Sequence, residues 1–522
     1  FFLSPKFITL LSIMGQTVTR LLFYPLDSIL DRLQGRMIQG KPGGIYLEGN
    51  FAPVETEYVH HALHIQGEIP EDLVGEFVRN GPNPKHVPKG GYHWFDGDGM
   101  LHGVRFHQDG SATYVNRWTR TRRLIEEEKA NRPLFVRIGE MHGKLGLLKL
   151  MTASIKSFLG VVKGTSLLEE GTANTAVHYH DGVFMALVEN DKPLAIRIFN
   201  DGRLEEIGKL DYDGKLKHPF TAHPKNDPIT NEMMFFGYSL RKKPYVQYSV
   251  ASAEGKLLRT TDIGVNRPTM MHDFAITENY SIFMDHPLEF DGKRIASGKF
   301  AFIFHEDAPS RIGVIPRHSN SKDDMKWFEF KTGYVFHTAT AWEEGNEIVM
   351  ICCRSEAIQL DDVVNTKFKP YLYEYRMNLE TGVSSERNIH ETPIACEFPT
   401  INPSVLGRKT RYCYCAELEG TGFSKCAKTD LETGNIVGQI SFGEGRSGGE
   451  CVFVPKVNNQ EEDDGYLLTF VYDEATNGST LWVMDAKTMA EEPIAIVELP
   501  QRVPYGFHGI YVSEEKIKNQ KY

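Results

Sequence analysis

The chain has 522 residues, of which 41% are hydrophobic, 11% aromatic and 24% charged, a composition typical of a folded globular protein rather than a disordered or fibrous one. Its formal net charge of −11 gives no overall attraction to nucleic acids or anionic membranes, which argues against a nucleic-acid-binding function. The seven cysteines all lie in the last third of the chain and form no CxxC pair, so a reducing compartment is expected rather than a zinc finger or a redox dithiol.

Residues 1–45 are predicted to form an amphipathic helical segment. Ser4-Pro5 has the form of a helix start, and apolar residues recur at helical spacing on both sides of Pro25: Phe7, Leu10, Leu11, Met14, Val18, Leu22, Leu26, Ile29, Leu30 and Leu33. No uninterrupted apolar stretch of about 18 residues is present, so a membrane-spanning helix is not expected. We interpret the segment as one that docks on a membrane surface.

From about residue 50 onward, short strand candidates alternate with turns, which predicts an all-β fold. Asp-Gly turns at Asp181, Asp201, Asp213 and Asp291 supply the positive φ angles that tight hairpins need. Strand-like runs cover residues 183–188, 233–238, 280–284, 347–352 and 466–471. The sequence Leu-Glu-Thr-Gly occurs at Leu379 and again at Leu431, and that interval is near the blade period of a β-propeller. No linker divides residues 46–522, which we treat as one domain.

Residues 130–165 interrupt the strand pattern with a predicted helical insertion. Its apolar residues are Leu145, Leu147, Leu148, Leu150, Met151, Ile155, Phe158 and Leu159, and they are interleaved with Lys144, Lys149, Lys156 and Lys163. Such a helix can lie in a bilayer interface with its lysines near the head groups. Alternatively, its apolar side packs on the β core. The second amphipathic segment at the N-terminus favours the membrane.

Four of the nineteen histidines lie in unusual apolar and aromatic surroundings. They are His223 in Phe-Thr-Ala-His-Pro-Lys, His272 in Met-Met-His-Asp-Phe-Ala-Ile-Thr, His337 in Phe-His-Thr-Ala-Thr-Ala-Trp-Glu and His508 in Val-Pro-Tyr-Gly-Phe-His-Gly. A lone histidine is more often a surface or core residue than a metal ligand, so we select these four histidines by the residues that surround them. Ligands this far apart in sequence cannot come from one helix or hairpin, and they would have to converge from different blades of a closed array.

These four segments resemble the carotenoid cleavage oxygenase family, and its plant carotenoid cleavage dioxygenases in particular. The segments Glu76-Phe-Val-Arg-Asn-Gly-Pro-Asn-Pro, Tyr92-His-Trp-Phe-Asp-Gly-Asp-Gly-Met-Leu-His, Gly171-Thr-Ala-Asn-Thr, Glu461-Glu-Asp-Asp-Gly-Tyr and Asp485-Ala-Lys-Thr-Met agree with it, from about residue 46 to 515. The resemblance implies a seven-bladed β-propeller with iron on its axis, a helical cap that carries the substrate tunnel, and apolar helices that dock on a membrane. The four histidines match the iron ligands of the family one for one.

The resemblance also implies that three glutamates orient the ligands: Glu189, Glu397 and Glu450 match the family's positions, and we assign them to His272, His337 and His508. A ligating imidazole normally donates its other N–H group to a carboxylate or a carbonyl, which fixes the orientation of the ring. Without the motifs, each of these glutamates would be interpreted as a solvated surface charge.

The chemistry that the resemblance implies selects the metal. Imidazole ligands alone suit iron, copper, nickel and zinc, but oxidative cleavage of an alkene requires a metal that activates O2, so we expect Fe2+. The implied reaction adds both atoms of O2 across one double bond of a carotenoid or apocarotenoid and gives aldehyde or ketone products. An apolar polyene would bind chiefly by apolar and aromatic burial. The tunnel candidates are Trp94, Phe95, Phe274, Phe336, Phe398 and Phe507, with core packing as the alternative for each.

Several alternatives remain open at this stage. Cleavage at the 9,10 and 9′,10′ bonds is favoured by His102-Gly-Val-Arg-Phe and by the context of Trp94, whereas the mixed character of Glu397-Phe-Pro-Thr-Ile-Asn-Pro leaves 11,12 cleavage of a 9-cis-epoxycarotenoid open. Relatives that cleave a stilbene or isomerise an alkene, and a non-catalytic propeller, are further alternatives. Asp96-Gly-Asp-Gly lacks the later ligands of a calcium loop and is interpreted as a turn. We expect the protein in a plastid or the cytoplasm, peripherally associated with a membrane.

Overall fold

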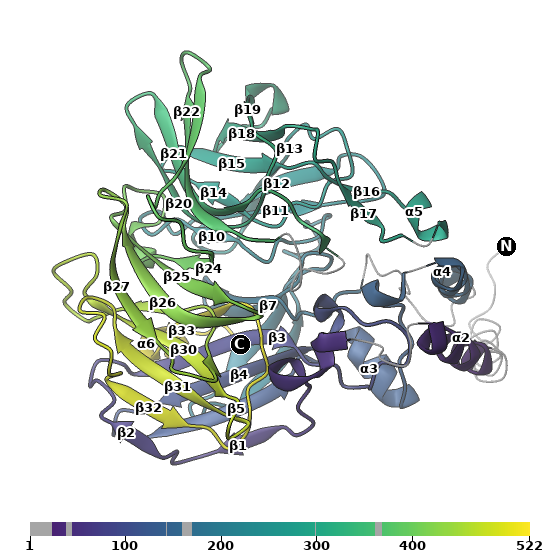
Figure 1. Cartoon of the computed structure of the whole chain (residues 1–522), viewed down its shortest axis with the longest axis horizontal. Helices are drawn as coiled ribbons and strands as arrows, with labels where there is room; N and C mark the ends of the chain where they lie inside the picture. The colour runs from purple at the N-terminus through teal and green to yellow at the C-terminus, as the bar shows by residue number, and fades with distance from the viewer. Residues whose placement is uncertain (1–22, 38–43, 142, 159–169, 298, 361–367) are drawn as a thin grey trace.

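The computed structural model describes residues 23–37, 44–141, 143–158, 170–297, 299–360 and 368–522. Within these residues, seven antiparallel sheets form the blades of a propeller, which confirms the predicted all-β, seven-bladed architecture (Figure 1). A two-stranded sheet of β16 (Leu288–Phe290) and β17 (Phe302–Phe304) lies outside the blades. The helices α2 (Tyr24–Met37), α3 (Arg122–Ala130), α4 (Gly143–Phe158) and α5 (Lys293–Ala296) lie on one side of the propeller, to the right in Figure 1, whereas α6 (Glu514–Lys518) lies on the left among the blades.

The first four blades follow the chain. Blade I contains β1 (Tyr58–His60), β3 (Gly75–Pro82), β4 (Gly99–Phe106), β5 (Ala112–Trp118) and β33 (Gly509–Ser513). Blade II contains β6 (Ala176–His180), β7 (Val183–Leu187), β8 (Leu194–Ile198) and β9 (Leu204–Lys209). Blade III contains β10 (Lys225–Asn226), β11 (Met233–Tyr238), β12 (Val246–Ala251) and β13 (Leu257–Asp262). Blade IV contains β14 (Phe274–Ile276), β15 (Tyr280–Asp285), β18 (Ser310–Pro316) and β19 (Lys326–Phe330).

The remaining three blades complete the ring. Blade V contains β20 (Tyr334–Glu344), β21 (Glu347–Ser355), β22 (Tyr371–Asn378) and β23 (Ser384–Asn388). Blade VI contains β24 (Cys396–Thr400), β25 (Tyr412–Glu419), β26 (Gly422–Asp430) and β27 (Asn435–Ser441). Blade VII contains β2 (Ile65–Gly67), β28 (Arg446–Ser447), β29 (Val452–Pro455), β30 (Gly465–Asp473), β31 (Gly478–Asp485) and β32 (Ala495–Glu498).

Both ends of the chain contribute to closing the ring. The C-terminal strand β33 pairs with β3 of blade I, and the N-terminal strand β2 pairs with β32 of blade VII. Each of these two blades therefore contains strands from opposite ends of the sequence, so main-chain hydrogen bonds within each blade hold the two ends of the chain together.

A separate apolar core fills each interface between neighbouring blades. Seven clusters of buried side chains correspond to the seven interfaces, for example Phe77 with Phe470 between blades I and VII, and Phe236 with Phe274 between blades III and IV. Because every blade packs on both faces, its inner strands are largely buried, as in β21, where all residues from Ile348 to Ser355 are buried.

Most of the predicted hairpin signals form hairpins. Asp181 and Gly182 join β6 to β7 with φ angles of 49° and 75°, the conformation for which Asp-Gly is favoured. The two Leu-Glu-Thr-Gly segments lie at the same hairpin of consecutive blades, between β22 and β23 and between β26 and β27. The prediction at Asp291-Gly292 is wrong, because the chain there enters the short helix α5 (Lys293–Ala296) before it returns as β17.

The helices of the described ranges are α2 (Tyr24–Met37), α3 (Arg122–Ala130), α4 (Gly143–Phe158), α5 and α6 (Glu514–Lys518), with 3-10 turns η2 (Gly44–Leu47), η3 (Gly49–Phe51), η4 (Trp94–Asp96), η5 (Ile138–Glu140), η6 (Lys322–Asp324) and η8 (Pro403–Val405). The predicted helical residues before Phe23 and after Phe158 lie outside the described residues. None of the described helices has both the length and the apolar character needed to span a bilayer.

The amphipathic helix α4 is oriented opposite to the expectation from its lysines. Lys149 and Lys156 are buried and form ion pairs with Asp31 and Asp27 of α2, whereas several apolar side chains of α2 and α4 point outward. The exposed apolar residues are Ile29, Leu33, Leu147, Leu148, Met151 and Ile155, exposed by 37–55%. The prediction that Lys149 and Lys156 lie near head groups is therefore wrong, because the two acids of α2 hold them inside.

Candidate metal centre

Each blade contributes one residue to a cluster of four histidines and three glutamates. His223 precedes β10 of blade III, His272 precedes β14 of blade IV, His337 lies in β20 of blade V, and His508 precedes β33 of blade I. Glu189 follows β7 of blade II, Glu397 lies in β24 of blade VI, and Glu450 precedes β29 of blade VII. The innermost segments of different blades meet near the centre of a propeller, so residues far apart in sequence converge there.

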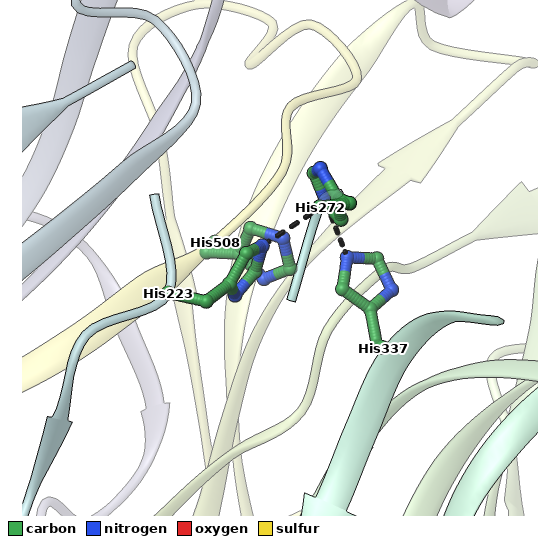
Figure 2. Close-up of side chains that lie close together, drawn as sticks. All are labelled: His223, His272, His337 and His508. Atoms are coloured by element: carbon green, nitrogen blue, oxygen red, sulfur yellow. Dashed lines mark hydrogen bonds between the residues drawn. The ribbon is translucent and has the colours of Figure 1, made fainter. Parts of the chain in front are cut away.

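The four imidazoles face one another (Figure 2). His272 Nε2 lies 3.0 Å from His223 Nε2 and 3.1 Å from His337 Nε2, and the ring of His508 lies 4.4 Å from the ring of His223 and 4.7 Å from that of His337, centre to centre. One nitrogen of each ring falls within 4.8 Å of the others. A metal–imidazole bond is about 2.1 Å long, so two ligands at a right angle place their nitrogens about 3 Å apart, which matches these separations.

Each of three imidazoles has a carboxylate on its outer nitrogen. His272 Nδ1 contacts Glu189 Oε1, His337 Nδ1 lies 2.5 Å from Glu397 Oε2, and His508 Nδ1 lies 2.8 Å from Glu450 Oε1. Among the described residues, no carboxylate contacts His223. With Nδ1–H of His272, His337 and His508 donating to these carboxylates, the Nε2 lone pair of each of the three rings points toward the centre of the cluster.

Every glutamate is itself fixed by a second donor. The hydroxyl of Tyr238 donates to Glu189 Oε2 at 2.6 Å, Phe398 N donates to Glu397 Oε2 at 2.7 Å, and Gly509 N donates to Glu450 Oε2 at 2.7 Å. Two of the three second donors are main-chain groups. The third is a side chain, which makes the Glu189 contact the one that a substitution can alter.

Burial favours the neutral form of the His223 and His337 rings. Burial, together with the neighbouring imidazoles, holds the pKa of His223 and of His337 well below the ordinary range. Burial would also lower the pKa of His272, but the Glu189 carboxylate raises it above its ordinary value. Burial raises the pKa of Glu397 to about 8. Neutral imidazoles are the form that ligates a metal ion, so the donor set fits a borderline transition metal.

Two other groups of ligand-type side chains have a different explanation. Cys353, Cys396 and Cys415 lie close together, but they are buried in the apolar core between blades V and VI, and burial raises the pKa of the Cys353 thiol well above its ordinary value. Neutral thiols in such a core pack as small apolar groups. The acidic group of Glu461, Asp463 and Asp464 is already paired with Lys428 and Lys487.

A cavity of 1290 Å³ adjoins the histidine cluster. Its lining includes His272, His337, His508 and two of the three glutamate partners, Glu189 and Glu397. It extends to Leu150, Ala153 and Ser154 of α4. Between these ends it is lined mainly by aromatic and aliphatic side chains, among them Phe300, Phe302 and Phe423. The cavity therefore has the length and apolar lining for a long apolar molecule that reaches from the helical side of the protein to the imidazoles of His272, His337 and His508.

Five of the six predicted tunnel residues line this cavity: Trp94, Phe95, Phe336, Phe398 and Phe507. Phe274 does not, and its prediction is wrong. The side chain of Phe274 alternates away from the axis in β14 and packs against Phe236 and Phe283 between blades III and IV. Asp96 caps a turn, accepting hydrogen bonds from Ile138 N and Gly139 N at 2.5 and 2.8 Å, in agreement with the interpretation of that segment as a turn.

No sequence motif identifies the residues that hold the histidines and glutamates of the cluster in place. Tyr238 binds Glu189, and the cavity wall formed by β16, β17 and α5 has no motif of its own. Asp273 has no motif of its own and directly follows His272 in the sequence. Its adjacency to a ligand candidate was the one available signal, because its partners come from other blades.

Comparison with known proteins identifies relatives over most of the chain. The family model described as retinal pigment epithelial membrane protein (RPE65) matches residues 51–513. A carotenoid 9,10(9′,10′)-cleavage dioxygenase 1 from Pisum sativum is 47% identical over 498 residues, covering 91% of each protein. The chloroplastic 9-cis-epoxycarotenoid dioxygenase NCED6 of Arabidopsis thaliana is 35% identical over 511 residues, covering 95% of this chain and 87% of the relative.

Solved structures share the same fold. Lignostilbene dioxygenase of Pseudomonas brassicacearum superposes with a TM-score of 0.78 at 27% identity, covering 91% of this chain and 98% of that one. Cobalt-substituted Synechocystis ACO superposes with a TM-score of 0.76 at 26% identity, covering 88% and 97%.

Proposed function

The chain belongs to the carotenoid cleavage oxygenase family, and on that premise we propose that it is an iron(II) dioxygenase that cleaves a double bond of a carotenoid or apocarotenoid. It is an oxidoreductase of the carotenoid cleavage dioxygenase class and a metal-dependent oxygenase. The observation that carries the proposal is the convergence of His223, His272, His337 and His508 at the end of an apolar cavity.

The four imidazoles would hold Fe2+, and three of them are oriented for it by Glu189, Glu397 and Glu450. Bound Fe2+ would supply the activation of O2 that lets both oxygen atoms add to one carbon–carbon double bond. Four ligands leave open positions on an octahedral ion, and imidazoles keep the ligand set neutral while the carboxylates balance charge from the outer side. No side chain needs to act as a general acid or base for this outcome, since the products form without net proton transfer.

The cavity would select the bond that is cleaved. A rigid polyene can slide only as far as the far wall allows, so the depth of the cavity beyond the imidazoles fixes which double bond lies beside the metal. Phe336, Phe398 and Phe507 flank His337 and His508, and their rings would hold the polyene by apolar burial and exclude water from the reacting bond.

Cleavage at the 9,10 and 9′,10′ bonds is the regiochemistry that we propose. The chain is 44–47% identical to relatives named for that cleavage, against 34–35% for relatives named as 9-cis-epoxycarotenoid dioxygenases. The second candidate is therefore cleavage at 11,12. The stilbene alternative rests on a structure at 27% identity and is less favoured.

We also propose that the protein docks peripherally on a membrane, in a plastid or facing the cytoplasm. The exposed apolar side chains of α2 and α4 form a surface beside the helical end of the cavity, whose wall includes Leu150, Ala153 and Ser154 of the same helix. A carotenoid dissolved in the bilayer could then enter the cavity without crossing water. The label chloroplastic on NCED6 belongs to that relative, and cell fractionation decides between the two locations for this chain.

The deciding experiment incubates anaerobically iron-loaded protein with β-carotene, zeaxanthin or an apocarotenal, admits O2 and identifies the products by mass. Cleavage at 9,10 gives a methyl ketone and an aldehyde, whereas cleavage at 11,12 gives two aldehydes, so the products separate the two candidates. Protein stripped of metal is the control. Full turnover by the stripped protein would contradict the metal dependence of the proposal, and no cleavage of any of the three substrates would favour a non-catalytic propeller.

A further inference from the structure

A buried carboxylate connects three of the segments that carry the imidazoles. The side chain of Asp273 is 1% exposed and accepts four hydrogen bonds, two on each oxygen. Oδ1 accepts from Lys225 Nζ at 2.8 Å and from Phe274 N at 2.7 Å. Oδ2 accepts from the main-chain N and the hydroxyl of Thr338, both at 2.8 Å. Because all of these donors lie on fixed segments, the carboxylate has little freedom to move.

Asp273 and its partners Lys225 and Thr338 lie one or two residues after the candidate ligands of three neighbouring blades. Lys225 is two residues beyond His223 in blade III, Asp273 directly follows His272 in blade IV, and Thr338 directly follows His337 in blade V. The pairing of β20 with β21 shifts register on both sides of Thr338. The bulge turns the main-chain N of Thr338 out of the sheet ladder and toward Asp273, so the local irregularity of β20 has a specific use.

The connection through Asp273 matters most for the position of His223. The other three imidazoles are oriented by glutamates, but His223 contacts no carboxylate among the described residues. Its segment is tied to the others through the Lys225 side chain, which is 14% exposed and also lies over the ring of Phe274 at 5.9 Å.

We propose that Asp273, Lys225 and Thr338 form a positioning clamp that sets the spacing of His223, His272 and His337 and so tunes metal affinity. The inference rests on the proposed metal-binding function. None of the three residues is part of the cavity lining, so the clamp acts through the ligands rather than on the substrate. Substitutions in it should therefore change metal binding and turnover per bound metal, while KM for the polyene stays near that of the wild type.

The energetics of buried charges predict a pattern among the variants. Lys225→Met or Asp273→Asn leaves one buried charge without its partner, which is costly, whereas the double variant removes both charges at once. The double variant should therefore be more stable than the sum of the single effects predicts. Thr338→Val removes only the hydroxyl donor at nearly constant volume, and Thr338→Ser retains that donor, so this pair tests the clamp without disturbing the ion pair.

A matched control is available in another part of the propeller. Lys428 and Asp463 form a buried pair at 2.6 Å, with side chains 3% and 8% exposed, between blades VI and VII. Lys428→Met should cost stability of the same kind as Lys225→Met, but it touches no segment that carries a candidate ligand. Comparing the two variants separates a general loss of folding stability from a specific effect on the metal centre.

The experiment titrates each purified variant anaerobically with Co2+ and records the visible absorption bands, which report ligand geometry, together with the dissociation constant. We expect Lys225→Met and Asp273→Asn to weaken Co2+ binding by about 10–100-fold, the range typical for loss of outer partners of metal ligands, and to shift the bands. Thr338→Val should show a smaller loss that Thr338→Ser reverses, and Lys428→Met should bind Co2+ as the wild type does.

Two failures can be told apart. If the wild type does not bind one Co2+ per chain, or if His272→Ala binds it equally well, the proposed function fails and the clamp with it. If the wild type binds Co2+ through His272 but Lys225→Met, Asp273→Asn and Thr338→Val retain its affinity and spectrum, the clamp alone is overturned. Equal losses in Lys428→Met and Lys225→Met would likewise overturn it, because they would show a general effect of stability.

Discussion

At the scale of single residues, we expect substitution of a histidine of the cluster to reduce activity more than substitution of a glutamate. His272→Ala removes one of four central imidazoles and the partner of Glu189, so we expect product formation to be abolished. Glu450→Ala leaves His508 in place without its outer acceptor, so metal occupancy or rate should fall by about 10–100-fold. Metal content and turnover of anaerobically loaded protein measure both.

His218→Ala is the control for these two variants. His218 is also buried, with Nε2 at 2.8 Å from Ser249 Oγ, but it lies outside the cluster. The His218→Ala variant should keep full metal occupancy. Retained activity in His272→Ala, or loss of metal in His218→Ala, would contradict the assignment of ligands.

The hydroxyl of Tyr238 offers a milder test of the same centre. Tyr238→Phe deletes the hydrogen bond to Glu189, which on its own is worth about 1 kcal/mol, so metal affinity should fall severalfold without loss of the fold. Tyr414→Phe deletes a comparable buried bond to the carbonyl of Ala486 and should lower only stability. Calorimetric metal titration and urea unfolding of both variants distinguish the outcomes; equal metal affinities would show that Glu189 needs no second donor.

The sequence predicted the cluster but not its support. The four histidines and three glutamates were found because each lies in a distinctive local motif. Phe274 was misplaced, because a motif does not show toward which side of a short strand a side chain points. Asp273 and Tyr238 were missed because their role depends on residues of other blades, and no local pattern of the sequence records that proximity.

At the scale of elements, helical periodicity identified α2 and α4 but not their orientation. Both helices carry charges on one side and apolar residues on the other, and a soluble protein would normally bury the apolar side. Here Lys149 and Lys156 pair with Asp31 and Asp27 inside, so the two helices hold each other through ion pairs and leave Met151 and Ile155 outside. The ion pairs between these two distant segments determine the orientation of the helices. Helical periodicity within one segment does not show such pairs.

The outward apolar face predicts a specific effect on membrane binding. Met151→Glu with Ile155→Glu places two charges on that face, so sedimentation with phosphatidylcholine vesicles should be lost while metal content is unchanged. Val437→Glu, at a residue of β27 exposed by 52%, is the matched control and should sediment as the wild type does. Unchanged sedimentation of the α4 variant would show that these residues do not contact the membrane.

At the scale of the whole molecule, the resemblance to the family implied a seven-bladed propeller and the Leu-Glu-Thr-Gly interval agreed with its blade period, but the closure of the ring was not predictable. β2 is only three residues long and has no alternating pattern, and its partner β32 lies at the other end of the chain. Closure brings His508 to the axis beside residues of blades III to V, so the integrity of the ring and the geometry of the metal centre depend on each other.

Gly67 tests the contribution of the β2 closure to stability. Its φ angle is +81°, and a Cβ atom there would lie 2.2 Å from the carbonyl oxygen of Ile494 next to β32. Gly382 has a similar φ of +74° with open space around it. Gly67→Ala and Gly382→Ala share the cost of a left-handed alanine, about 1–2 kcal/mol, but only Gly67→Ala must displace β32. Urea unfolding should show a larger loss for Gly67→Ala; equal losses would mean that the β2 pairing adds little.

Metal binding should stabilise the entire propeller, because the ligands and their partners come from all seven blades. An ion that binds only the folded state at 100 times its dissociation constant adds about 2.7 kcal/mol to the free energy of unfolding. We therefore expect Co2+ to raise the midpoint of thermal unfolding of the wild type but not of His272→Ala. Mg2+, which prefers oxygen ligands, should leave both midpoints unchanged. An ion held by residues of several blades must oppose the separation of those blades, so its binding has to raise the midpoint. A midpoint that does not respond to Co2+ would therefore mean that the imidazoles do not share one ion.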